Sequence, residues 1–177
     1  MSVFAQSLGA SFSTLPPALQ DFHAGASPRH FIGTASVEHG TNPLARMGIK
    51  LGGFPPAGRS MPFAIRVTQT AQGECWARDF DGHITQSTLM YDHARQQIVE
   101  RLGALTCALQ LSQNAGQLHV DVARLWLFGV PLPSILLPRS FSREWQDDGG
   151  AFCFDIGAHL PGGALLIRYQ GRLVPQL

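Results

Sequence analysis

The sequence has 177 residues, a length typical of one domain that buries about 70% of the surface of its unfolded chain. Hydrophobic residues make up 45% and charged residues 14% of the chain, so we expect either a large core or an apolar surface that something covers. The net charge of +1 gives no overall field that would attract nucleic acid or anionic lipid from a distance. We therefore expect no nucleic-acid partner.

Membrane spans, disulfides and metal sites are not predicted. No apolar run reaches the roughly 18 residues of a spanning helix, and Met1 to Leu15 lacks the basic start of an export signal. The three cysteines have no CxxC spacing, and the seven histidines have no HxH, HxxxH or HExxH spacing. These patterns predict a single domain over residues 1–177 in the reducing cytoplasm, without a cofactor.

Two short helices are predicted in the first third of the chain. Ser13 to Ala24 begins with hydroxyl residues and prolines and repeats apolar residues on one face, and Phe31 to Val37 then reads as a strand. Thr41 or Asn42 can cap the second helix before Pro43, and two glycines end it. This second helix carries Leu44, Met47 and Leu51 on one face.

From Met61 onward, apolar side chains recur at every second residue, as in half-buried strands. The clearest turns are Asp81-Gly82 and the segment Asn114 to Gly116. Predicted strands cover residues 61–67, 75–80, 83–90, 105–111, 118–126, 152–158 and 164–173. Ala94 to Leu102 fits a helix as well as a strand, with a turn into a strand favoured, and Phe141 to Gln146 is one further candidate strand.

The predicted elements give a mainly β (α+β) fold. We expect a strongly curved antiparallel sheet or half-barrel of about eight strands, with the two short N-terminal helices against it. The βαβ rhythm of a nucleotide-binding domain is absent, and so are the GxGxxG and P-loop motifs.

Four motifs in this order resemble a bacterial family called domain of unknown function 4166 (DUF4166). They are CWARDF (75–80), WLFGVPLP (126–133), FCFD (152–155) followed by Pro161-Gly162, and YQG (169–171). The resemblance extends from about Leu19 to Leu173. In that family the domain also follows an NAD-binding domain similar to saccharopine dehydrogenase, which implies an accessory role beside a separate NAD-dependent oxidoreductase.

One arginine stands out among the residues that could bind a ligand. Trp76, Arg78 and Phe80 share one face of a predicted strand, and a guanidinium between two aromatic side chains must find a partner if it is buried. The alternatives are a salt bridge to Glu100 or Asp155, a solvated position, or an anionic ligand. The candidate ligand-binding residues are Trp76, Arg78, Phe80, Trp126 and Tyr169.

These residues favour a binding module without catalytic activity of its own, which encloses a lipid-like or amphipathic metabolite whose acidic end meets Arg78. The two other hypotheses are an accessory domain of an oxidoreductase and a protein-interaction domain. No catalytic residue is predicted, and the sequence leaves open whether the protein is a monomer or a homodimer.

Overall fold

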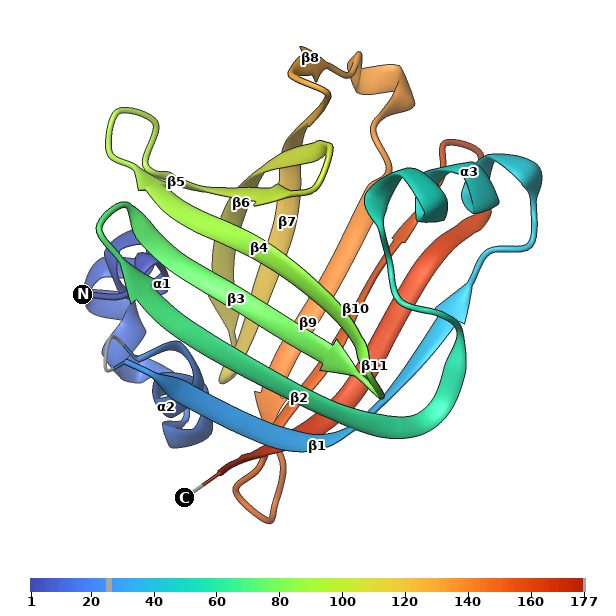
Figure 1. The fold of residues 1–177 in the computed structure, drawn as a ribbon. Helices are drawn as coiled ribbons and strands as arrows, with labels where there is room; N and C mark the ends of the chain where they lie inside the picture. Colours follow the sequence, from blue (N-terminus) through green and yellow to red (C-terminus); the bar gives the residue numbers. More distant parts are fainter. Residues whose placement is uncertain (25–26, 177) are drawn as a thin grey trace.

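A computed structural model describes residues 1–24 and 27–176, in which most strands form a closed antiparallel barrel (Figure 1). The helices are α1 (Val3–Leu8), α2 (Pro17–His23) and α3 (Pro43–Gly52), with short 3-10 turns at Gly9–Thr14 and Ser134–Leu136. The strands are β1 (Arg29–His39), β2 (Gly58–Thr70), β3 (Gly73–Phe80), β4 (His83–Asp92), β5 (Gln97–Leu102), β6 (Leu105–Asn114), β7 (Gln117–Leu127), β8 (Val130–Pro131), β9 (Arg139–Gln146), β10 (Phe152–His159) and β11 (Leu165–Pro175).

The expected half-barrel of about eight strands is wrong, because the part of the chain that the structure describes forms a closed barrel of ten strands. The sheet order is β6-β5-β4-β3-β2-β1-β11-β10-β9-β7, and β6 also pairs with β7, which completes the circle. The two-residue strand β8 lies beside β7 outside this circle. The two segments that the sequence left open both form strands, β5 within Ala94 to Leu102 and β9 over Phe141 to Gln146. They raise the number of barrel strands from the predicted eight to ten.

The described residues form three short helices in place of the two predicted. The unpredicted helix α1 is capped by Ser2, whose side chain accepts a hydrogen bond from the Ala5 N–H. The predicted cap of α3 is confirmed, because the Asn42 side chain accepts from the Ala45 N–H, and Gly53 ends the helix in the left-handed conformation. No helix among residues 1–24 and 27–176 is long and apolar enough to cross a membrane.

The strand connections divide the barrel into two ends. Helices α1 and α2 lie at one end, the α1–α2 end, together with the β2–β3, β4–β5, β6–β7 and β9–β10 connections. Helix α3 lies at the other end, the α3 end, together with the β3–β4, β5–β6, β7–β9 and β10–β11 connections. Figure 1 shows α1 and α2 on the left, and α3 and β8 at the top.

Aromatic side chains fill the interior at the α1–α2 end. Phe4 stacks on His23 with ring centroids 3.9 Å apart, and Phe22 stacks on Phe152 at 3.8 Å. His23 is fully buried, and its Nε2 lies 2.7 Å from Glu144 Oε2 on β9. This hydrogen-bonded pair ties α2 to the barrel wall. It also gives the Glu144 carboxylate a partner, because burying a carboxylate without one costs several kcal/mol of free energy.

The barrel closes between β7 and β9 largely through serine side chains. Leu118 and Glu144 are the only described residues of these strands that pair as in a regular ladder. Beyond them, the Val120 N–H donates to Ser142 Oγ at 2.6 Å, and the Val122 N–H donates to Ser140 Oγ at 2.8 Å. The two hydroxyls therefore take the place of backbone carbonyls along this seam.

Replacing Ser142, which is buried, should weaken this seam. Ser142→Ala leaves the Val120 N–H without its acceptor, so we expect the free energy of unfolding to fall by about 1 to 2 kcal/mol, measured by urea denaturation. Ser112→Ala changes an exposed serine of β6 and is the matched control. Equal stabilities of the two variants would show that the hydroxyl does not hold the seam.

Candidate functional site

A charged pair lies inside the barrel on three neighbouring strands. Arg78 Nη1 on β3 donates to Ser87 Oγ on β4 at 2.8 Å, and Arg78 Nη2 donates to Glu100 Oε1 on β5 at 3.0 Å. Strand register places all three side chains on the inner face, because Trp76 pairs with Ser87 and Leu89 pairs with Glu100. The Arg78 and Glu100 side chains are 23% and 19% exposed, so water reaches both charges.

Two aromatic side chains complete the surroundings of this pair. The Arg78 guanidinium lies over the Trp76 ring, 5.4 Å from its centroid, at a distance that permits a cation–π interaction. Burial raises the pKa of the Tyr169 hydroxyl, the positive charge of Arg78 acts to lower it, and the negative charge of Glu100 acts to raise it. Tyr169 on β11 therefore feels the field of both charges and is a neutral hydroxyl at physiological pH.

Cys107 on β6 lies directly opposite Glu100 on the inner face of the barrel. Burial, and secondarily the negative charge of Glu100, raise the pKa of its thiol to about 12. A thiolate is the nucleophilic form of cysteine, so this environment makes Cys107 unreactive. Its contribution to the site is a small, weakly polar surface.

Four of the five predicted ligand-binding residues face the interior, and Trp126 does not. Strand β7 contains one extra residue, Ala123, at a bulge where Ala108 pairs with Arg124 and Leu109 pairs with Val122. The bulge reverses the alternation, so Trp126 pairs with Thr106 on the outer face. The ring centroids of Phe80 and Tyr169 lie 5.8 Å apart, and both side chains line the interior with Trp76 and Arg78.

The partner of Arg78 is Glu100, one of the two carboxylates considered from the sequence. Asp155, the other, accepts two hydrogen bonds from Arg168 at 2.8 Å each on the outer face of β10 and β11. Ser87 was missed, because an isolated serine in a strand gives no signal before its register is known.

A second ionic group at the α1–α2 end was also missed. Glu74, fully buried, accepts a hydrogen bond from Trp76 Nε1 at 2.9 Å and lies 3.3 Å from Arg29 Nη2. Glu74 shares the alternation of Trp76 and Arg78, and this spacing could have placed it on the same inner face. Its charge is neutralised by Arg29 within the packed half of the barrel, so we assign it a structural role.

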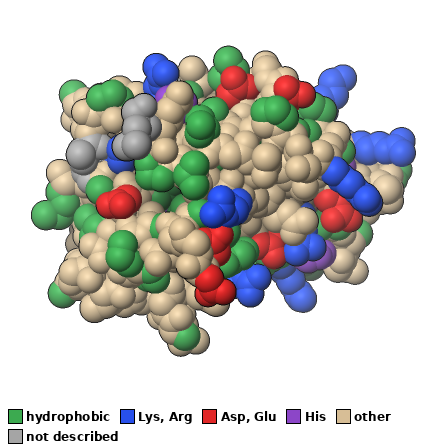
Figure 2. Space-filling model, turned by 90° about the horizontal axis from the view of Figure 1, so that it is seen from below, with side chains coloured by type: hydrophobic (Ala, Val, Ile, Leu, Met, Phe, Trp, Pro, Cys, Tyr) green, Lys and Arg blue, Asp and Glu red, His purple; other side chains and the backbone are tan. Residues whose placement is uncertain are grey.

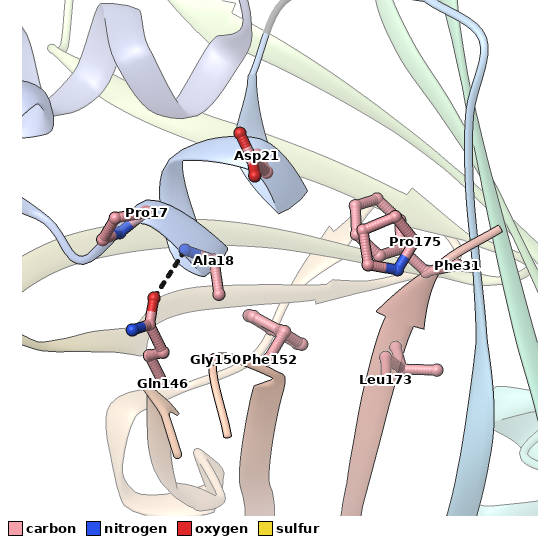
Figure 3. A pocket seen from close by; sticks show the side chains of 9 residues that line it. All are labelled: Pro17, Ala18, Asp21, Phe31, Gln146, Gly150, Phe152, Leu173 and Pro175. Carbon is pink, nitrogen blue, oxygen red and sulfur yellow. Dashed lines mark hydrogen bonds between the residues drawn. The ribbon is translucent and has the colours of Figure 1, made fainter. Parts of the chain in front are cut away.

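A small pocket lies beside α2 at the α1–α2 end of the barrel (Figure 3). Its volume is about 200 Å³, and Phe31, Phe152 and Leu173 form an apolar part of its lining. Gln146 Oε1 accepts a hydrogen bond from the Ala18 N–H at 2.8 Å, and Asp21 supplies the one charged side chain. None of the five predicted residues lines this pocket, and it is smaller than the roughly 300 Å³ of common ligand sites.

Comparisons with known proteins give a family and no relative of known function. Residues 15–173 match the sequence profile of a family described as Domain of unknown function (DUF4166). Neither the search of curated proteins nor the search of solved structures found a match.

The raised pKa of Cys107 predicts how stability depends on pH. The folded protein favours the neutral thiol, so this contribution is complete below the ordinary pKa of 9.0 and is lost as the pH rises from there toward about 12. Between about pH 8 and pH 10, the wild type should lose about 1 kcal/mol more unfolding free energy than Cys107→Ala. Urea denaturation at both pH values measures this difference.

Cys75→Ala, which removes a thiol from the outer face of β3, is the control for the loss of a cysteine. Identical pH dependence in wild type and Cys107→Ala would contradict the burial of this thiol.

Proposed function

Because the chain belongs to the family described as Domain of unknown function (DUF4166), which carries no assigned activity, we propose a function from the barrel interior. The barrel binds a small amphipathic molecule in the half next to α3, with the acidic end of the ligand at Arg78. The observation that carries this proposal is a guanidinium inside the barrel that is still partly exposed.

One side of the interior next to α3 offers an apolar surface that water reaches. Several inner-face side chains toward the α1–α2 end are buried, among them Ile98 and Leu118, which have no exposed surface. Toward the α3 end, many inner-face side chains on the β5, β6, β7 and β10 walls are partly exposed: Leu102, Leu105, Leu125, Leu127 and Ile156. An apolar ligand that covered these side chains would gain roughly 25 cal/mol for each Å² removed from water.

Arg78 has hydrogen-bonding capacity beyond its protein partners. A guanidinium carries five N–H donors, and Ser87 and Glu100 accept from two of them. These partners fix the orientation of the guanidinium, which reduces the conformational entropy that a ligand would have to remove on binding. The remaining donors suit a carboxylate, sulfonate or phosphate oxygen.

Glu100 opposes the binding of an anion at Arg78. An acidic ligand at Arg78 comes close to the Glu100 carboxylate, and the two negative charges repel each other. Glu100 therefore weakens binding of an anion while it holds the empty site together. The proposal assigns no reaction to the site, because Ser87 contacts Arg78 rather than a base and Cys107 is a neutral thiol.

Titration with anilinonaphthalene sulfonate, an apolar anion whose fluorescence rises on burial, tests the site. We expect saturable binding to the wild type, stronger binding to Glu100→Gln, and binding about tenfold weaker in the double variant Arg78→Met/Glu100→Gln than in Glu100→Gln. The double variant removes both charges, so no unpaired charge is left inside the barrel. Dodecanoate should displace the probe from the same site.

Arg66→Met removes an exposed arginine from the outer face of β2 and is the matched control. Equal affinities of Glu100→Gln and the double variant, with unchanged circular dichroism, would end the proposal that Arg78 binds the anion. Failure of the wild type to bind either probe would end the proposal of an amphipathic ligand.

A further inference from the structure

The exposed large hydrophobic side chains gather at one end of the barrel. Among the described residues eleven such side chains are exposed, and eight of them lie at the α3 end. Seven belong to α3 and the β7–β9 connection, and we call them the apolar rim: Leu44, Met47, Leu51, Phe128, Val130, Ile135 and Leu136. The eighth, Ile84, lies next to the acidic β3–β4 turn and is not part of the rim.

Helix α3 turns its large side chains outward because small residues form its inner side. Ala45 is fully buried, and a Cβ at Gly48 would lie 3.1 Å from Leu166 on β11, so this side packs closely on the barrel. Leu44 and Met47, on the other side, are 63% and 55% exposed. The apolar face that the sequence predicted is thus the face that α3 leaves uncovered.

The β7–β9 connection also holds its apolar side chains away from the protein. The Phe128 N–H donates to the Ala104 carbonyl at 2.8 Å, and the Leu132 N–H donates to the Leu125 carbonyl at 2.8 Å. These bonds fix the base of the connection, while Phe128 and Ile135 are 72% and 79% exposed. Figure 1 shows this connection and α3 at the same end of the barrel.

The two segments that carry the rim contain only positive charges, although Glu38, Asp79 and Asp81 lie elsewhere at the same end of the barrel. Residues 40–60 and 122–139 contain no Asp or Glu and five exposed basic side chains: Arg46, Lys50, Arg59, Arg124 and Arg139. None of the five makes a salt bridge within the described residues. On the face shown in Figure 2, by contrast, acidic and basic side chains are interspersed.

We propose that the apolar rim docks on an anionic lipid membrane. Its side chains insert at the boundary between headgroups and acyl chains, and the five basic side chains contact the anionic headgroups, as in other proteins that lie on a membrane surface. A second copy of the chain fits this surface less well, because two such rims would bring together ten basic side chains, none of them in a salt bridge within the described residues. Docking is independent of whether the barrel holds a ligand.

Flotation with phosphatidylcholine vesicles, with and without phosphatidylserine, tests this proposal on the intact protein. We expect binding that requires phosphatidylserine and weakens as salt is raised. The variant Ile135→Ser/Leu136→Ser should bind about tenfold more weakly, because two inserted side chains are lost. The matched control is Ile32→Ser/Val174→Ser, which changes an exposed cross-strand pair of β1 and β11 and should bind as the wild type does.

A charge variant tests the electrostatic part. Arg46→Glu in α3 should weaken binding about tenfold, and Arg66→Glu, the same change on β2, should have little effect. The proposal is overturned if the wild type does not float with anionic vesicles, or if the rim and control variants bind equally. It is also overturned if sedimentation shows a dimer that Ile135→Ser/Leu136→Ser dissociates.

Discussion

Closure of the barrel is the constraint on which the rest of the structure depends. Once β6 pairs with β7 and β7 lies against β9, each strand has a fixed inner and outer face, and serine side chains bridge the one seam that lacks a full backbone ladder. Eight strands enclose a space that side chains just fill, and ten enclose more. The chain must therefore fill the additional space or leave part of it accessible, and it does both. Helices α1 and α2 insert Phe4, Phe22 and His23 at one end, whereas the inner faces of β5, β6, β7 and β10 toward α3 stay partly exposed.

Buried ion pairs differ between the two ends of the barrel, because the α1–α2 end is more densely filled than the α3 end. At the α1–α2 end, His23 and Glu144 are almost completely removed from water, and so are Arg29 and Glu74. Such pairs hold elements in register, and loss of one partner leaves a costly unpaired charge. Arg78 and Glu100 make a similar pair, but water reaches both side chains. A pair in that position can exchange one partner for a ligand at a smaller cost in free energy, and this difference separates the proposed site from the structural pairs.

The sequence predicted the local structure well and the closure poorly, for physical reasons. Alternating apolar residues and the Asp81-Gly82 turn identify strands and hairpins, because both signals act over a few residues. Closure depends on β7 meeting β9 through Ser140 and Ser142, and no short-range pattern marks two serines as substitutes for backbone acceptors. The same limit explains the position of Trp126. Its spacing from Leu118 predicts the inner face, and one bulge residue moves it outward. Likewise, only the strand register shows that Asp155 pairs with Arg168, which leaves Glu100 for Arg78.

The net charge and composition of the whole chain do not reveal the basic and apolar side chains that lie together at the α3 end. A net charge of +1 argues against attraction to anionic surfaces, yet the basic residues of two segments without any acidic residue flank the apolar rim. At physiological salt, charges farther apart than about 8 Å are largely screened, so a membrane responds to the local cluster more than to the total. The apolar composition likewise divides between a packed core and an uncovered rim. The partly exposed inner-face side chains of β5, β6, β7 and β10 lie at the same end as this rim, so a lipid-like molecule that left a membrane there would have a short path to Arg78.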